Sequence, residues 1–260
     1  MKHQFYKYHG TGNDFIIIDN RRNIFDKNNA NLVSQWCDRR FGIGADGLIL
    51  LEDHPNYDFK MVYYNSDGNI STMCGNGGRC ITHFAQYLGI IADSAIFEAI
   101  DGKHYAKISK VGIELQMNAV NDITKYIDHL VLNTGSPHFV TLIENLDDLN
   151  VDVEGRAIRY NDQYVKEGIN VNFVERVNGS QFRVRTYERG VEGETLSCGT
   201  GVTAVAIAMN YIGETENNVV KVITKGGDLK VTFERKDNDG YDNIRLIGPA
   251  QQVYKGEISW

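Results

Sequence analysis

The chain repeats one local pattern at a separation close to half its length, and this repeat constrains the fold more than any other feature. In the first copy, a strand-like run at Phe59–Tyr64 and a polar loop lead to Cys74-Gly-Asn-Gly and a helix-like stretch. In the second copy, Phe182–Tyr187 and a polar loop lead to Cys198-Gly-Thr-Gly and another helix-like stretch. Cys198 follows Cys74 by 124 residues in a chain of 260. A repeat of this kind predicts two similar domains related by an approximate twofold axis.

Hydrophobic periodicity indicates the fold class. Helical spacing predicts helices over Ala30–Arg39, Gly77–Leu88, Asp152–Tyr160 and Gly201–Ile212. Alternating or short apolar runs predict strands at Gln4–His9, Phe15–Asp19, Leu48–Leu51, Phe59–Tyr64, Ala95–Phe97, Tyr105–Met117, His129–Asn133, Phe139–Ile143, Ile169–Arg176, Gln181–Tyr187, Val219–Thr224, Leu229–Glu234, Asn243–Leu246 and Val253–Ile258. Interleaved strands with two principal helices per half predict an α+β fold with antiparallel or mixed sheets and a domain boundary near residues 118–124.

Composition and charge exclude several functions. A hydrophobic fraction of 42% with 23% charged residues is typical of a globular protein. The net charge of −7, with dispersed basic residues, argues against a nucleic acid or an anionic membrane as partner. No apolar run approaches the roughly 18 residues that span a bilayer, and the N-terminus shows no signal-peptide core. We therefore expect a soluble protein in the cytoplasm.

The four cysteines divide into two kinds. Without a secretion signal, reduced thiols are expected rather than a disulfide framework. Cys37 and Cys80 lie in helix-like contexts without a symmetric counterpart, which indicates structural thiols. Cys74 and Cys198 each stand before a Gly-x-Gly turn that opens a helix, where unpaired N–H groups and the helix dipole favour a thiolate and bind a carboxylate.

Two thiols at the starts of two helices in equivalent positions of the repeat suggest a reaction that inverts a stereocentre. One thiolate removes a proton from a carbon while the other thiol returns a proton to the opposite face, and no cofactor is required in principle. Helix N-termini can hold the substrate carboxylate and stabilise the developing charge. Two alternatives stay open: a pair of inert buried thiols in a duplicated fold, and a redox pair, although Cys-x-x-Cys is absent.

Two other sequence signals do not predict a cofactor or metal site. Gly42-Ile-Gly-Ala-Asp-Gly47 matches a dinucleotide fingerprint, which should follow a strand and open a helix. Here a helix-like stretch precedes the motif and the strand-like Leu48–Leu51 follows it, which argues against NAD. The seven histidines show no metal-ligand spacing, so no metal site is predicted.

A series of short motifs resembles the diaminopimelate epimerase family. The segments that carry the resemblance are His9-Gly-Thr-Gly-Asn-Asp-Phe, Gly42-Ile-Gly-Ala-Asp-Gly, Asn65-Ser-Asp-Gly, Met73-Cys-Gly-Asn-Gly-Gly-Arg-Cys, Gly135-Ser-Pro-His, Gly168-Ile-Asn-Val-Asn-Phe, Tyr187-Glu-Arg-Gly, Ser197-Cys-Gly-Thr-Gly and Gly248-Pro-Ala. The resemblance implies a cofactor-independent isomerase that interconverts LL- and meso-diaminopimelate for lysine and peptidoglycan synthesis. It also implies two domains, 1–118 with about 248–260 and 119–247, each a barrel-like mixed sheet around a central helix. A homodimer is compatible with it.

The resemblance also assigns roles to single residues. Cys74 and Cys198 would be the acid/base pair. The residues expected to hold the carboxylate at the reacting centre are Gly75, Asn76, Gly199 and Thr200, and those expected to bind the rest of the substrate are Asn13, Asn65, Asn170, Glu188 and Arg189. His138 and Glu188 would tune the ionisation of the cysteines.

The chain departs from the family pattern in three places. Ser136 stands where many members have asparagine, Gly47 where some have glutamine, and Glu192 adds a residue to the loop before the second cysteine. These departures concern recognition of the distal end of the substrate, so a different small carboxylate, as in the related proline racemases and isomerases, is one alternative. A non-catalytic amino-acid-binding protein is another.

Overall fold

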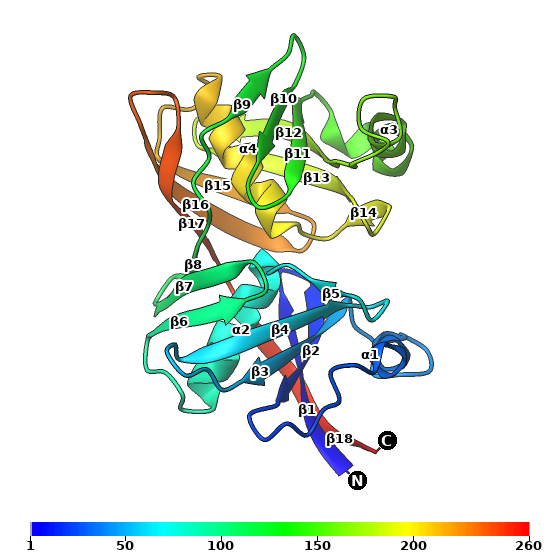
Figure 1. Ribbon diagram of the computed structural model, residues 1–260. Coiled ribbons are helices and arrows are strands. Elements are labelled where there is room, and N and C mark those ends of the chain that lie inside the picture. Colours follow the sequence, from blue (N-terminus) through cyan, green and yellow to red (C-terminus); the bar gives the residue numbers. More distant parts are fainter. Residues whose placement is uncertain (1, 260) are drawn as a thin grey trace. The chain divides into compact units, whose positions relative to one another are not determined.

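The computed structural model describes residues 2–259, which form two compact units (Figure 1). Unit 1 contains the residues up to Leu115 and the segment from Gly248 onward, and unit 2 contains Gln116–Ile247. Within residues 2–259, no helix combines the length and apolar character that crossing a membrane requires.

Unit 1 is a mixed sheet. Its strands are β1 (Lys2–Gly10), β2 (Asn13–Asp19), β3 (Gly47–Glu52), β4 (Phe59–Asn65), β5 (Ile70–Ser71), β6 (Ser94–Ala99), β7 (Gly102–Ser109), β8 (Gly112–Gln116) and β18 (Gln251–Ser259). They pair in the order β18-β1-β2-β3-β4-β6-β7-β8, with β5 added to β4. The pairs β2–β3 and β4–β6 are parallel, and the others are antiparallel. Helix α1 (Ala30–Cys37) precedes β3, and α2 (Gly75–Tyr87) precedes β6.

Unit 2 repeats this topology strand for strand. Its strands are β9 (Ile123–Lys125), β10 (Leu130–Asn133), β11 (Pro137–Leu142), β12 (Asn170–Asn178), β13 (Gln181–Glu188), β14 (Gly193–Thr195), β15 (Val219–Thr224), β16 (Gly227–Arg235) and β17 (Tyr241–Gly248). They pair in the order β9-β10-β11-β12-β13-β15-β16-β17, with β14 on β13. Again two pairs are parallel, β11–β12 and β13–β15. A 3-10 turn (Leu146–Asp148) and α3 (Val151–Arg159) precede β12, and α4 (Gly199–Tyr211) precedes β15.

Each sheet wraps around one helix. The strands β1, β2, β3 and β7 pack on α2, and β10 to β13, β15 and β16 pack on α4. Every residue of α4 from Gly201 to Asn210 is buried, as its nearly all-apolar sequence requires. The predicted α+β class, with two pseudo-symmetric barrel-like sheets around central helices, is confirmed.

The structure corrects several predicted boundaries. The run Tyr105–Met117, predicted as one strand, is the hairpin β7–β8, which pairs Ser109 with Gly112. Gly112 has φ 128°, a backbone angle that favours glycine. Both central helices also begin two residues before the predicted start, directly after the repeated cysteines. The strands β5, β9 and β14 were not predicted because two or three residues are too few to show a period.

Candidate active site

Each repeated cysteine is the N-cap residue of a central helix. Cys74 precedes α2 with φ −89° and ψ 130°, and Cys198 precedes α4 with φ −115° and ψ 112°. The first helical hydrogen bonds run from the Gly78 N–H to the Cys74 carbonyl (2.7 Å) and from the Val202 N–H to the Cys198 carbonyl (2.9 Å). The three N–H groups before each donor therefore lie outside the helical ladder. They form the partly positive end of the helix, which suits a thiolate or a carboxylate.

Amide side chains surround the half-buried Cys74. Its Sγ donates to Oδ1 of Asn13 (3.5 Å), the first residue of β2. The same oxygen accepts a hydrogen bond from Asn76 Nδ2 (3.1 Å) in the first turn of α2. The structure thus brings three of the predicted site residues together in unit 1.

Cys198 is buried and lies against the first turn of α4. Its Sγ is 3.5 Å from Oγ1 of Thr200, and the Thr200 carbonyl accepts a hydrogen bond from Thr134 Oγ1 (2.8 Å). A Cβ atom built on Gly201 would lie 2.5 Å from Asn172 Oδ1 and 3.5 Å from Cys198 Sγ. The Asn172 side chain therefore occupies the space that a side chain at position 201 would need.

His138 is held in one neutral tautomer. Asn172 Nδ2 donates to the Phe139 carbonyl (2.9 Å) and lies 3.1 Å from His138 Nδ1, while Asn172 Oδ1 accepts from Thr186 Oγ1 (3.0 Å). Nδ1 is consequently the acceptor, and the ring proton is on Nε2. Burial, with a smaller contribution from Arg189, lowers the His138 pKa to about 3. Nε2 is buried and has no hydrogen-bond partner within residues 2–259, so it is a donor available to a further group.

Acidification should reduce stability through His138. Because its pKa is about 3 in the folded chain and 6.5 ordinarily, the unfolded chain binds the extra proton between these values and stability falls as pH falls through this window. We expect this residue to account for about 2 kcal/mol lost between pH 7 and pH 5. Urea unfolding at both pH values measures this loss, which should be smaller by that amount in His138→Gln. Equal losses in wild type and variant would contradict the assignment.

Asn170 and Arg189, two of the three predicted distal residues of unit 2, lie in one hydrogen-bonded cluster. Asn170 Nδ2 donates to Ser136 Oγ (2.9 Å) and to the Pro137 carbonyl (2.9 Å), and its Oδ1 accepts from the Arg189 N–H (2.9 Å). The Arg189 guanidinium donates to Ser136 Oγ (3.2 Å) and to the Glu167 carbonyl (3.0 Å). Ser136, one of the departures from the family pattern, therefore bridges two predicted substrate-binding residues.

Glu188 and Asn65 occupy matching ends of β13 and β4. The carboxylate of Glu188 accepts a hydrogen bond from Thr195 Oγ1 (2.9 Å) on β14. Asn65 is exposed at the end of β4 and pairs in register with Gly47. Each is the last residue of the strand that precedes its repeated cysteine, one residue beyond the predicted end of that strand.

Gly47 has no room for a side chain. A Cβ atom there would lie 2.5 Å from the Tyr64 carbonyl oxygen and 2.6 Å from the Tyr63 ring. Because backbone and a buried ring bound this space, a glutamine could enter only after strands β3 and β4 shift. The second departure from the family pattern, glycine instead of glutamine at position 47, thus fits the lack of space there.

The additional loop residue is fixed within unit 2. Glu192 has φ 59°, and its carboxylate accepts from the Gly190 N–H (3.1 Å) and the Tyr187 hydroxyl (3.3 Å) and pairs with Arg159 (3.3 Å). Burial raises the pKa of Glu192, but these contacts and a hydrogen bond from the Tyr160 hydroxyl outweigh it and lower that pKa below its usual value. The extra residue therefore fixes the position of the loop through its own side-chain contacts.

The other two cysteines are buried, as predicted. Burial raises the pKa of Cys37 to about 12 and raises that of Cys80 still further, so both stay neutral thiols. Within residues 2–259 none of the four cysteines forms a disulfide bond, and no three histidine, cysteine or carboxylate side chains gather as metal ligands.

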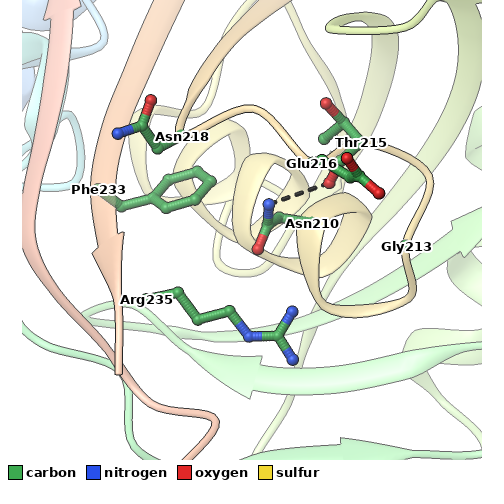
Figure 2. A pocket seen from close by; sticks show the side chains of 7 residues that line it. All are labelled: Asn210, Gly213, Thr215, Glu216, Asn218, Phe233 and Arg235. Carbon is green, nitrogen blue, oxygen red and sulfur yellow. Dashed lines mark hydrogen bonds between the residues drawn. The ribbon is translucent and has the colours of Figure 1, made fainter. Parts of the chain in front are cut away.

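A pocket of about 340 Å³ lies at the far end of α4 (Figure 2). Its first lining residue, Asn210, follows Cys198 by 12 positions, which is roughly 18 Å along a helix. Asn210 Nδ2 donates to the Thr215 carbonyl (3.0 Å), and its Oδ1 accepts from the Tyr241 hydroxyl (2.8 Å). This amide closes the loop after the helix, and the pocket takes no part in the cysteine sites.

Three residues that contact the predicted site residues were not themselves predicted: Asn172, Asp46 and Arg79. Asp46 accepts a hydrogen bond from Asn13 Nδ2 (2.7 Å), and Arg79 Nη2 donates to Asn76 Oδ1 (2.9 Å). Asn172 and Asp46 lie within motifs that carry the family resemblance, and so does Arg79, five residues after Cys74. Their place in these motifs was the signal that could have identified them as site residues. Their contacts, however, depend on the packing of strands and helices that are distant in sequence.

Comparisons with known proteins agree with this arrangement. A family model for diaminopimelate epimerase matches residues 5–121 and 130–253. Diaminopimelate epimerase of Flavobacterium psychrophilum is 54% identical over 256 residues, covering 98% of this chain and 100% of the relative. The Chlorobaculum tepidum enzyme of the same name is 43% identical, covering 96% and 99%.

Solved structures show the same fold at low sequence identity. A Bacillus anthracis protein of the phenazine biosynthesis PhzF family superimposes with a TM-score of 0.78 at 13% identity, covering 100% of both chains. A hydroxyproline epimerase from Agrobacterium vitis gives 0.69 at 13% identity, covering 99% of this chain and 92% of that one. Because the family model matches residues 5–121 and 130–253 and two relatives above 40% identity cover at least 96% of the chain, this chain belongs to the diaminopimelate epimerase family.

Proposed function

We propose that this chain is an isomerase that interconverts LL- and meso-diaminopimelate without a cofactor. The observation that carries the proposal is the placement of Cys74 and Cys198 as N-caps of equivalent helices in two units of the same topology. Near full-length identity of 54% to a curated diaminopimelate epimerase supports the substrate. The chemistry needs an acid and a base of the same kind, and the duplicated fold supplies one from each half.

In the proposed reaction, the thiolate of one cysteine takes the α-proton and becomes a thiol. The thiol of the other cysteine gives its proton to the opposite face of the same carbon and becomes a thiolate, so the roles are exchanged after each turnover. The N–H groups of Gly75-Asn76 and Gly199-Thr200 hold the adjacent carboxylate and stabilise the negative charge that develops on it. The proton count is therefore balanced by the two sulfur atoms.

The remaining predicted residues would bind the substrate and tune the thiols. An arginine with amide donors suits a carboxylate and a glutamate suits an ammonium, so the distal amino-acid end would be bound by Asn13, Asn65, Asn170, Glu188 and Arg189. The Nε2–H of His138 would donate to the charged form of a nearby group, and Glu188 would act on the ionisation of a cysteine as well. We further propose domain limits at 1–118 with 248–260 and at 119–247, a cytoplasmic location and a homodimeric assembly.

Solvent deuterium exchange tests the proposal. With LL-diaminopimelate in D₂O, we expect deuterium at the α-carbon and formation of the meso isomer, both followed by mass spectrometry and chiral chromatography. Proline and glutamate serve as control substrates and should show neither. Exchange on proline instead would assign a different substrate, and tight binding of diaminopimelate without exchange would identify a non-catalytic binding protein.

A further inference from the structure

Two amide side chains form a relay between charged groups in unit 1. Asn13 Nδ2 donates to Asp46 Oδ2 (2.7 Å), and Asn13 Oδ1 accepts from Asn76 Nδ2 (3.1 Å). Asn76 Oδ1 in turn accepts from Arg79 Nη2 (2.9 Å). Cys74 Sγ joins the relay at its centre, where it donates to Asn13 Oδ1 (3.5 Å).

The charged ends set the direction of both amides. A carboxylate only accepts hydrogen bonds, so Asp46 requires the NH₂ group of Asn13. A guanidinium only donates, so Arg79 requires the oxygen of Asn76. Turning either amide would place two donors or two acceptors against each other. Asp46 and Arg79 therefore require the same orientation of the two amides, in which the acceptor Oδ1 of Asn13 faces the Cys74 sulfur.

Both charged ends are themselves held in place. Arg79 is fully buried, and its other donors reach the Gly75 carbonyl (3.2 Å), the Pro249 carbonyl (3.3 Å) and Thr11 Oγ1 (3.4 Å). All of these acceptors are neutral, so the cation is fixed by geometry and not by a carboxylate. Asp46 is held by Arg39, whose Nη2 donates to Asp46 Oδ1 (2.6 Å).

We infer that Asp46 and Arg79 are positioning residues that keep the Asn13 oxygen turned toward Cys74 and so favour the thiol form of that cysteine in the substrate-free protein. An acceptor stabilises S–H and offers nothing to a thiolate. Resting on the proposed function, this makes the substrate-free protein ready for the direction of epimerisation in which Cys74 is the proton donor. Arg79 and Cys80 interact electrostatically with this cysteine, Asp101 accepts a hydrogen bond from the N–H of the preceding Met73 (3.1 Å), and Asp46 reaches it through Asn13.

Substituting Asp46→Asn should weaken the relay at its carboxylate end. The new amide has one oxygen for two sets of donors, Arg39 on one side and the Asn13 NH₂ group with the Asp14 N–H on the other. Asn76 then holds the Asn13 oxygen alone, so the turned amide, with its NH₂ group toward Cys74 where a donor favours the thiolate, becomes more populated. We expect alkylation of Cys74 by iodoacetamide at pH 7, without substrate, to become about three- to tenfold faster. The pH midpoint of alkylation should fall by about half a unit to one unit.

Arg39→Gln is the matched control. It removes the ion pairs of an exposed side chain with Asp46 and Asp14. The Asp46 carboxylate and its hydrogen bonds from Asn13 Nδ2 and the Asp14 N–H stay, so the alkylation rate and the pH profile of Cys74 should stay as in the wild type. Peptide mass spectrometry follows Cys198 in the same samples, and its rate should not change. An unchanged Cys74 profile in Asp46→Asn, or an equal change at Cys198, would overturn the inference. Because alkylation needs no substrate, this result is independent of the epimerase assay.

Discussion

Replacing Cys74 or Cys198 by alanine should reduce kcat for epimerisation by at least about 1,000-fold. General acid–base catalysis by one positioned group contributes about 10²–10⁴ in rate, and each single variant lacks either the proton acceptor or the proton donor in both directions. A coupled assay with LL-diaminopimelate measures the loss, and circular dichroism verifies the fold. Substantial turnover by either variant would contradict the two-base proposal.

Cys80→Ala is the matched control for this experiment. Cys80 lies on the same helix as Cys74, is fully buried and is held neutral by its surroundings. Removing its sulfur leaves a small cavity that should cost about 1 kcal/mol of unfolding free energy. Because the thiol takes no part in the proposed proton transfer, we expect kcat to stay within about twofold of the wild type.

Gly201→Ala should damage both stability and activity. The new methyl group would lie 2.5 Å from Asn172 Oδ1, an atom held by a hydrogen bond from Thr186, and 3.3 Å from the Cβ atom of Cys198. Either the amide must leave His138 or the first turn of α4 must move together with Cys198. We expect the unfolding free energy to fall by about 3 kcal/mol and kcat/KM to fall by about 100-fold.

Gly77→Ala provides the pseudo-symmetric comparison in α2. Here the new methyl group would meet side-chain termini, Ile49 Cδ1 at 3.1 Å, Met61 Cε at 3.3 Å and Phe15 Cζ at 3.6 Å. Flexible ends can shift by the required few tenths of an ångström, and alanine favours the helix over glycine by about 1 kcal/mol. Urea unfolding should therefore differ from the wild type by less than about 1.5 kcal/mol. If Gly77→Ala and Gly201→Ala lowered the unfolding free energy equally, packing around Asn172 would not be the cause of the loss in Gly201→Ala.

The sequence alone was sufficient for the repeat, the fold class and the position of both cysteines. A strand, a loop and a cysteine before Gly-x-Gly are local signals, and an N-cap is determined by the few residues around it. The repeat of these signals indicated that the second half would copy the first, which the matching strand orders of the two units confirm. Local patterns did not separate β7 from β8, because the turn between Ser109 and Gly112 is only two residues long and Val111 continues the alternation of the second strand.

Only the tertiary structure decided the environment of each sulfur. The partners of Asn13 and Asn172 lie more than 30 residues away, at Asp46 and His138, and they meet because parallel strands place them side by side. Amide orientation, the histidine tautomer and the lack of space at Gly47 follow from these long-range pairings. A sequence determines its turns and helix ends through neighbouring residues, whereas the direction of a hydrogen bond between distant side chains depends on the packing that brings them together.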